Sequence, residues 1–327
     1  MRSLFWLVIG LCAAACGSSA NGAGAATADA AEDTLVAADT AADVPIDAAV
    51  AEVPTGPQPS APKAYTGTCP AFSAGKLEIE SAGYKRRAYV SLPDEPAGAP
   101  VVFLWHGLGD TAADMKSAFG ADALAKKTGA VVITPDSCCN APGAPSNGQP
   151  NCCVLMTGWG FTDDAPKGDA QLFDDLLSCA DSTLKIDRTR VYTTGFSAGA
   201  LWSTWLLMHR ADYLAAAVLF SGGVNDFVPY LKPSYKLPVL SAWGGDTDIF
   251  MNGLIDFQAS SADLRKNLRK DGHFVVGCNH GGGHTVPGGG PKFAFDFLLQ
   301  HVWKDGSSPY LASGLPATYP KYCAIEL

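Results

Sequence analysis

The segment GFSAG at residues 195–199 has the residue types and spacing that expose a nucleophilic serine. In the pattern G-x-S-x-G, a glycine on each side of the serine allows a sharp turn from a strand into a helix, which leaves the hydroxyl exposed at the end of a sheet. Residues 190–194 form a β-rich run, and a helical pattern begins at Ala198. We therefore predict that Ser197 is a nucleophile rather than part of a purely structural glycine-rich turn.

Two of the six histidines are candidates for the general base that a serine hydroxyl requires. His280 and His284 lie in a glycine-rich loop between the last predicted strand and the last predicted helix, and we favour His284. Because Cys278 precedes them, a metal site is an alternative, but no further ligand cluster accompanies these residues. The other histidines are expected to be structural: His106, His209, His273 and His301.

A carboxylate must hold the imidazole in the correct tautomer and stabilise its protonated form. Asp246 and Asp248 follow the β-rich run 238–243 and lie between Ser197 and His284 in the chain, which is the order of one class of serine hydrolases. We favour Asp248 as this carboxylate. Asp246 is then a turn residue, a position in which Asp is common.

Two backbone N–H groups are predicted to bind the oxyanion that forms when a serine attacks a carbonyl group. One belongs to Ala198, which follows the nucleophile, and the other to Leu108, in the segment HGLG that follows the β-rich run 101–105. Each such donor contributes about 3 kcal/mol to transition-state stabilisation. A tight turn with no binding role is the alternative for the glycines of HGLG.

Short β-rich runs alternate with helical patterns along most of the chain, and this alternation predicts an α/β fold with a mostly parallel sheet and helices on both faces. Strands are expected at residues 87–92, 101–105, 130–134, 190–194, 215–220, 238–243 and 273–277. Helices are expected at residues 112–127, 170–184, 198–209, 257–269 and 292–303.

The stretch 136–168 is rich in Gly, Pro, Asn and paired cysteines, and it is longer than an ordinary loop. A loop of this length is usually functional or held by cross-links. We expect Trp159 and Phe161, which lie within it, to line a substrate cleft. The alternative is that both aromatic side chains are buried beneath the loop.

Eight cysteines follow Cys16, and an even number in an exported protein favours disulfides. The doublet Cys138 and Cys139 is expected to pair with the doublet Cys152 and Cys153, a cross-link that would contribute about 3 kcal/mol. Structural zinc is disfavoured because the doublets lack the usual C-x-x-C spacing. The pairing of the other four is left open: Cys69, Cys179, Cys278 and Cys323.

The composition excludes several classes of protein. The formal net charge is −9, the isoelectric point is about 5.0 and no basic run is present, which argues against a nucleic-acid-binding protein. Charged residues make up only 17% of the chain and aromatic residues reach 10%, which argues against a coiled coil and against general disorder. The 327 residues suffice for one sizeable core.

The first 66 residues are predicted to lie outside the folded domain. Residues 1–15 have the pattern of a signal peptide, and their apolar run is too short to span a bilayer. Residues 16–66 are rich in Ala, Pro and acidic residues, which predicts a flexible tether. An alanine-rich helix is the alternative, but the prolines disfavour it. A single catalytic domain is then expected at residues 67–327.

The motifs together resemble the polyhydroxybutyrate-depolymerase and feruloyl-esterase branch of the secreted α/β-hydrolases. The resemblance covers approximately residues 66–303, and it implies an α/β-hydrolase fold with His284 as the base and Asp248 as its carboxylate. The chain departs from the family pattern at Ala200, Gly244 and Val286. Four segments carry the resemblance: HG at 106–107, RVYTTGFSAG at 190–199, GDTD at 245–248 and GGHTVPG at 282–288.

The segment that ends at Cys16 resembles the lipobox of bacterial lipoproteins, and Gly17 after it resembles lipoproteins sent to the outer membrane. This resemblance implies a lipid on Cys16 as the only membrane contact. Cleavage by ordinary signal peptidase, which would give a secreted protein, is the alternative.

The resemblance implies a carboxylic-ester hydrolase that acts through an acyl-enzyme on small-molecule or polymeric esters, without a cofactor or metal. Hydroxycinnamoyl, acetyl and hydroxyalkanoate esters all remain open as substrates. Two other functions are also open: a catalytically inactive binding lipoprotein that retains the hydrolase fold, and a serine peptidase on the same fold.

Overall fold

The computed structural model describes residues 58–137, 158–161, 168–304 and 306–326. The chain divides into two units, residues 1–52 and 53–327, and the first lies wholly outside the described residues. The predicted signal peptide, Cys16 and the two cysteine doublets also lie outside them. In the part of the chain that is described, no helix is both long enough and apolar enough to cross a membrane.

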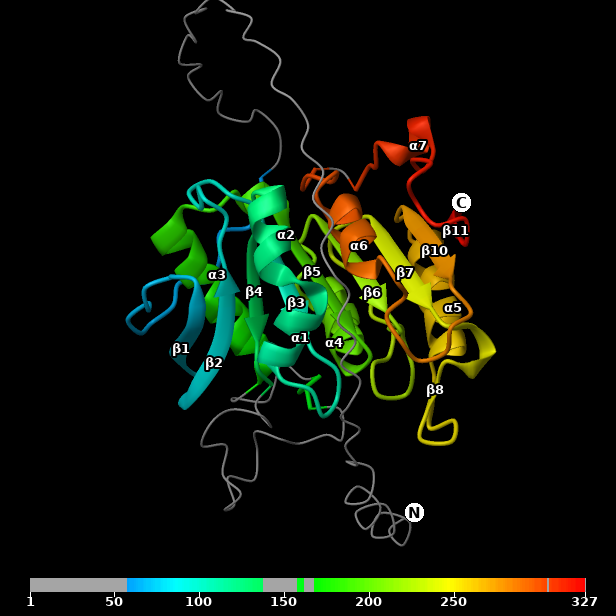
Figure 1. The fold of residues 1–327 in the computed structure, drawn as a ribbon, viewed down its shortest axis with the longest axis horizontal. Coiled ribbons are helices and arrows are strands. Elements are labelled where there is room, and N and C mark those ends of the chain that lie inside the picture. Colours follow the sequence, from blue (N-terminus) through cyan, green and yellow to red (C-terminus); the bar gives the residue numbers. More distant parts are fainter. Residues whose placement is uncertain (1–57, 138–157, 162–167, 305, 327) are drawn as a thin grey trace, which may run out of the picture. The chain divides into compact units, whose positions relative to one another are not determined.

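A nine-stranded sheet forms the centre of the described structure, with the order β1-β2-β4-β3-β5-β6-β7-β10-β11 (Figure 1). The six strands from β4 to β10 in this order run parallel, and the antiparallel β1, β2 and β11 lie at the edges. This arrangement confirms the predicted mostly parallel sheet. The strands are β1 (Gly75–Ser81), β2 (Tyr84–Ser91), β3 (Val101–Trp105), β4 (Val131–Pro135), β5 (Val191–Phe196), β6 (Ala216–Phe220), β7 (Val239–Trp243), β10 (Val275–Asn279) and β11 (Cys323–Glu326).

The burial of each strand follows from its sequence. β3, β4, β6 and β7 are buried at every position, as expected of parallel strands covered on both faces, and they read as continuous apolar or small residues. β1 alternates buried and exposed residues, which is typical of a strand with one solvated face. The edge strands β1 and β11 were not among the predicted strands, because a short strand at a sheet edge carries a weak apolar signal.

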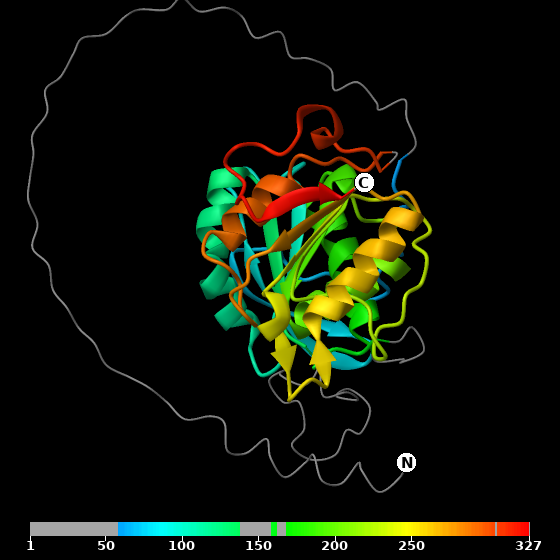
Figure 2. The ribbon, with the colours of Figure 1, turned by 90° about the vertical axis from the view of Figure 1, so that its right-hand side faces the viewer.

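Helices cover both faces of the sheet, and each face has its own apolar core (Figures 1 and 2). One core holds residues of α3, α4 and α5, and the other holds residues of α1, α2 and α6. The helices are α1 (Ala112–Phe119), α2 (Ala121–Thr128), α3 (Asp169–Leu184), α4 (Ala198–His209), α5 (Phe257–Lys270), α6 (Gly290–Leu298) and α7 (Tyr310–Ser313).

The prediction of one continuous helix at 112–127 is wrong. Gly120 adopts a left-handed conformation with φ of 62°, and its N–H caps the end of α1 by donating to the carbonyl groups of Lys116 and Ser117. A glycine in this conformation ends a helix without steric cost. The chain therefore turns at Gly120 and begins the separate helix α2.

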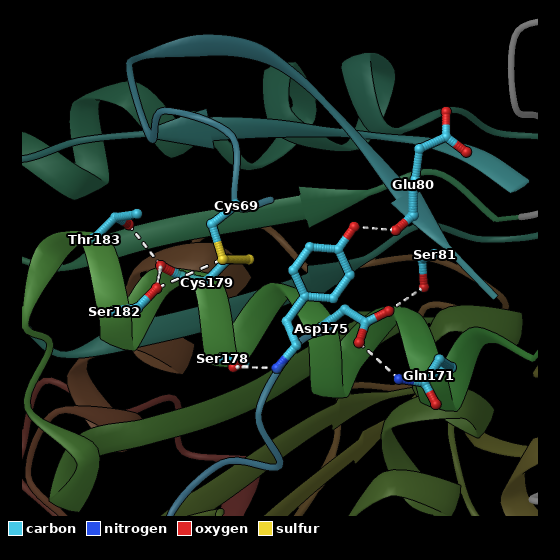
Figure 3. The surroundings of a disulfide bond; sticks show 10 residues. Cys69, Glu80, Ser81, Gln171, Asp175, Ser178, Cys179, Ser182 and Thr183 are labelled. Carbon is cyan, nitrogen blue, oxygen red and sulfur yellow. Dashed lines mark hydrogen bonds between the residues drawn. A yellow bond between two sulfur atoms is a disulfide. The ribbon is translucent and has the colours of Figure 1, made fainter. Parts of the chain in front are cut away.

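Within the described residues, two disulfides join segments far apart in the sequence, and they settle the pairing of the four cysteines left open above: Cys69 with Cys179, and Cys278 with Cys323. The first ties the segment before β1 to α3, where the Tyr65 N–H also donates to Ser178 Oγ at 3.0 Å (Figure 3). Ser60 likewise donates its N–H to the Asp212 carbonyl at 3.2 Å. The packed unit thus includes residues that precede the predicted boundary at 67.

Candidate active site

The carboxyl ends of the parallel strands meet at one edge of the sheet, and the predicted site residues follow these ends. Ser197 follows β5, Asp248 lies in the loop after β7, and His284 lies in the loop after β10. In an open α/β sheet this edge is where ligands bind. The parallel topology therefore brings together side chains that are 87 positions apart in sequence.

Ser197 occupies a strained turn between β5 and α4. Its φ of 55° and ψ of −120° lie in a region that residues other than glycine rarely adopt. The turn fits only because Gly199 lacks a Cβ, since a Cβ there would collide with the carbonyl of Trp105. The Ser197 N–H donates to the Phe220 carbonyl at 2.9 Å, which fixes the turn against β6.

His284 links the serine to the carboxylate. Its Nε2 lies 2.8 Å from Ser197 Oγ, and its Nδ1 lies 2.7 Å from Asp248 Oδ1. An ionised carboxylate only accepts hydrogen bonds, so Nδ1 carries the proton and Nε2 is free to accept the serine hydroxyl proton. The imidazole is also held by aromatic rings, with Phe257 stacked at 4.6 Å and Phe196 at 4.8 Å between ring centroids.

Asp248 is fully buried, and both of its carboxylate oxygens accept hydrogen bonds. Besides His284 on Oδ1, the hydroxyl of Ser221 and the N–H of Gly244 each donate to Oδ2 at 2.8 Å. A buried carboxylate requires such donors, because burial without them strongly disfavours its charged form. Sequence reasoning missed Ser221, although its place directly after β6, at the same sheet edge, was a usable signal.

The loops that carry the acid and the base are in direct backbone contact. The Gly283 N–H donates to the Gly244 carbonyl at 2.9 Å, and the His280 N–H donates to the Trp243 carbonyl at 3.0 Å. A Cβ on Gly244 would collide with the Gly283 carbonyl, so only glycine permits this approach. This contact explains why glycine rather than a larger residue precedes the GDTD segment.

Comparisons with known proteins show that the chain is similar to esterases. No protein-family model matches the chain. Feruloyl esterase D of Neurospora crassa is 26% identical over 255 residues, which cover 71% of this chain and 74% of that protein. The crystal structure of native sOPH superposes with a TM-score of 0.63 at 20% identity, covering 82% of this chain and 97% of that one. The feruloyl esterase of the CE1 class from Anaeromyces mucronatus, solved with ferulic acid, has a TM-score of 0.50 at 18% identity and covers 74% and 94%.

The chain has an α/β-hydrolase fold and is similar to esterases of that fold. The fold predicted from the motifs is therefore confirmed, and so is the assignment to the carboxylic-ester hydrolases.

The alternative candidates for the acid, the base and a metal ligand in this esterase are Asp246, His280 and Cys278. Asp246 is exposed in the short 3-10 helix Gly245–Thr247, and among the described contacts none joins it to His284. The Nδ1 of His280 accepts the Gly282 N–H at 3.2 Å, and burial lowers the pKa of His280. Cys278 is bonded to Cys323, so it offers no thiolate to a metal. Among the described residues, no group of three or more His, Cys, Asp or Glu is placed to hold a metal ion.

The predicted oxyanion loop follows β3, and the side chain of His106 holds it in position through two hydrogen bonds. The Nδ1–H of His106 donates to the Gly107 carbonyl at 2.7 Å, and its Nε2 accepts the Ser137 N–H at 3.0 Å. Burial lowers the pKa of His106, which favours the neutral ring that these bonds require. Within the described residues, the N–H groups of Leu108 and Ala198 donate to no protein acceptor, so both are available to a ligand.

Trp159 and Phe161 do not line an open cleft in this esterase. Their exposed fractions are 1% and 7%, and Trp159 Nε1–H donates to the His106 carbonyl at 2.9 Å. The Trp159 ring packs against Trp105 and Trp202 of the core. The contacts favour the alternative interpretation, in which both side chains are buried: Trp159 supports the strand end that precedes Leu108, and Phe161 packs against Trp202.

Proposed function

We propose that Ser197, His284 and Asp248 form a catalytic triad that hydrolyses carboxylic esters through an acyl-enzyme. The observation that carries the proposal is the imidazole of His284, which bridges the serine hydroxyl and a buried carboxylate with hydrogen bonds of 2.8 and 2.7 Å. This is the arrangement in which a histidine can accept the serine proton and a carboxylate can stabilise the imidazolium that results.

In the acylation step, Ser197 Oγ bonds to the carbonyl carbon of the ester while His284 Nε2 takes the hydroxyl proton. The carbonyl oxygen becomes an oxyanion, which the N–H groups of Leu108 and Ala198 are available to bind. When the tetrahedral intermediate collapses, the bond to the leaving oxygen breaks and His284 returns its proton to that oxygen. The alcohol departs, and the acyl group remains on Ser197.

In the deacylation step, water repeats the same chemistry. His284 Nε2 takes a proton from the attacking water, the new oxyanion forms at the same two N–H groups, and the proton returns to Ser197 Oγ as the acid leaves. Asp248 stays ionised throughout, held by the donors of Ser221 and Gly244. Each proton and bond is accounted for by the side chains named, so the cycle needs no cofactor.

The substrate class proposed from the relatives is an ester of a hydroxycinnamic, acetic or short hydroxyalkanoic acid. A relative named feruloyl esterase supports the first of these. We also propose that the enzyme works outside the cytoplasm, because disulfides such as Cys69–Cys179 persist in oxidising compartments. The lipid anchor at Cys16 is part of the same proposal.

The test combines an active-site label with one substitution. A fluorophosphonate should label the wild-type enzyme at Ser197 and should fail to label Ser197→Ala, while thermal unfolding shows that the variant remains folded. Hydroxycinnamoyl esters and hydroxybutyrate oligomers, assayed side by side, identify the preferred acid. Labelling or hydrolysis that persists in Ser197→Ala would overturn the triad, an unlabelled wild type would point to the inactive binding protein, and faster amide than ester turnover would point to a peptidase.

A further inference from the structure

A fully buried ion pair joins β2 to α3. Arg86 of β2 and Asp169, the first residue of α3, form a salt bridge between Nη2 and Oδ1, and their side chains are 0% and 1% exposed. The attraction between two buried charges repays the cost of removing them from water only when further hydrogen bonds satisfy both groups. Within the described residues, Nε and Nη1 of Arg86 have no hydrogen-bond partner. Stability alone is therefore a poor explanation for this pair.

Each member of the ion pair also binds the backbone of another segment. Arg86 Nη2 donates to the Asp136 carbonyl at 3.1 Å, directly after β4. Asp169 Oδ2 accepts the Gly160 N–H at 2.8 Å, in the described segment 158–161. The ion pair thus ties these two segments to each other.

The residue next to each of these contacts binds His106, the first residue of the oxyanion loop (residues 106–110). The Ser137 N–H donates to His106 Nε2 at 3.0 Å, and Trp159 Nε1–H donates to the His106 carbonyl at 2.9 Å. The contacts therefore close into a ring, which we call the anchoring ring. Its members, in order, are Arg86, Asp136, Ser137, His106, Trp159, Gly160 and Asp169.

The other end of the oxyanion loop is held by the same ring. The buried Asp136 carboxylate accepts the N–H of Ala112, the first residue of α1, on Oδ1 at 2.6 Å. Arg87 Nε donates to the other carboxylate oxygen. Asp136 therefore binds α1 directly after the oxyanion loop, while its neighbour Ser137 binds His106 at the start of that loop.

His106 sets the direction of the predicted oxyanion donor. Its Nδ1–H donates to the Gly107 carbonyl at 2.7 Å. That carbonyl and the Leu108 N–H belong to one peptide unit, which is planar, so the N–H points away from the carbonyl. A His106 ring that is fixed at Nε2 and at its own carbonyl therefore fixes the line along which the Leu108 N–H points.

We propose that the Arg86–Asp169 ion pair positions the Leu108 oxyanion donor through the anchoring ring. The inference rests on the proposed triad and its oxyanion site, and it assigns a role to two residues outside them. Arg86 and Asp169 are positioning residues, because they hold the segments that hold His106. A donor that is already aimed needs no reorganisation when the oxyanion forms, so the benefit arises in the transition state rather than in substrate binding.

Replacement of the ion pair by apolar side chains separates positioning from stability. Arg86→Met with Asp169→Leu removes both charges together with the hydrogen bonds to the Asp136 carbonyl and the Gly160 N–H. Such a replacement is often neutral or stabilising, so the variant should be about as stable to urea as the wild type. Its kcat should nevertheless fall about tenfold with KM nearly unchanged, a part of the 100-fold or larger loss that follows removal of an oxyanion donor.

An alkyl trifluoromethyl ketone reports on the oxyanion site itself. Ser197 Oγ bonds to the ketone carbon, its proton passes to His284 Nε2, and the carbonyl oxygen becomes an oxyanion. The inhibition constant Ki should therefore rise about tenfold in the variant, in parallel with the fall in kcat/KM. The pH at which kcat/KM is half-maximal should stay unchanged, because the variant leaves His284 and Asp248 intact.

Trp159→Phe tests the anchoring ring at a second point without changing any charge. The substitution removes the Nε1–H that binds the His106 carbonyl and keeps an aromatic side chain in the core. It should lower kcat and raise Ki in the same proportion, with KM nearly unchanged. This variant decides the question if Arg86→Met with Asp169→Leu fails to fold.

Arg210→Met with Asp174→Leu is the matched control. Asp174 also lies on α3, and it accepts Arg210 Nε at 2.9 Å and Nη2 at 3.1 Å. The described hydrogen bonds of this pair do not lead to His106. The same chemical replacement here should leave kcat, KM and Ki unchanged, whatever it does to the stability of the protein.

The other outcomes overturn the proposal. Wild-type kcat and Ki in the folded variants would show that the ring is merely structural, and a fall in kcat without a rise in Ki would place the effect away from the oxyanion. Equal losses in the control pair would show a general effect of removing charges from α3. If the wild type hydrolysed no ester and Ser197 resisted the fluorophosphonate, the triad itself would fail, and the inference with it.

Discussion

The hydroxyl of Ser221 donates a hydrogen bond to Asp248 Oδ2 at 2.8 Å, and it does so from a backbone with a φ of 53°. This φ lies in the left-handed region, which costs a residue other than glycine about 1 kcal/mol or more. Ser221 therefore adopts a strained conformation that aims its hydroxyl at the carboxylate behind His284. We interpret Ser221 as a positioning residue of the site.

Removal of this hydroxyl should slow the reaction without unfolding the enzyme. In Ser221→Ala, Asp248 keeps the hydrogen bond from the Gly244 N–H. The variant should lower kcat about tenfold, which corresponds to the free energy of one hydrogen bond to a charged group, and should leave KM nearly unchanged. Ser221→Gly lacks the same hydroxyl but relieves the positive φ, so it should be as slow as Ser221→Ala and more stable to urea. If activity followed stability across the two variants instead, Ser221 would be merely structural.

The two aspartates of the GDTD segment should differ sharply in their effect on rate. Asp248→Asn should reduce kcat by about three to four orders of magnitude, because an amide favours the wrong imidazole tautomer. Asp246 is exposed, so Asp246→Asn should stay within about twofold of wild type, inside the range of an ordinary surface change. Steady-state rates on one ester decide the matter, and a large loss in Asp246→Asn would reverse the assignment.

Acid should destabilise the fold partly through His301. Burial lowers the pKa of His301 to about 4, below the ordinary value of about 6.5 that the unfolded chain has. Between these two values the unfolded state binds more protons, so stability is fully present above about pH 6.5 and is lost as the pH falls towards 4. The loss attributable to this residue approaches about 3 kcal/mol.

Urea unfolding at pH 7 and at pH 4.5 measures this effect. His301→Asn can still donate to the Phe297 carbonyl and accept from Ser308, the partners of His301 Nδ1 and Nε2, but it does not titrate. Its free energy of unfolding should therefore fall less with pH than that of the wild type. Burial lowers the pKa of His106 and His273 as well, so some pH dependence of the same sign should persist. Identical pH dependence in wild type and variant would contradict the assignment.

The disulfide between Cys69 and Cys179 should contribute to stability but not to catalysis. It closes a loop between cysteines that are 110 positions apart in the sequence. Removing a bridge that closes a loop of this size lowers the stability of the protein by about 4 kcal/mol. The pair Cys69→Ser with Cys179→Ser should show this loss in urea unfolding, while kcat/KM of the folded enzyme stays unchanged. A drop in kcat/KM under fully native conditions would show that the segment before β1 contributes to the site.

Local signals in the sequence were sufficient for much of the site. The glycines around Ser197 reveal the strained turn because no other residue type permits it, and the alternation of strands and helices predicts the parallel sheet. The chain order of Ser197, Asp248 and His284 then selects the candidates, because parallel strands deliver their carboxyl ends to the same edge. All of this depends on residue type and spacing within a few turns or strands.

Contacts between distant segments were decided only by the tertiary structure. Ser221 has no motif, and its role depends on the distance from β6 to the loop after β7. The burial of Trp159 and the pairing of Cys69 with Cys179 depended on which segments pack together. Sequence encodes local conformation and apolar pattern strongly, whereas the partner of a side chain is set by the free energy of packing the whole chain.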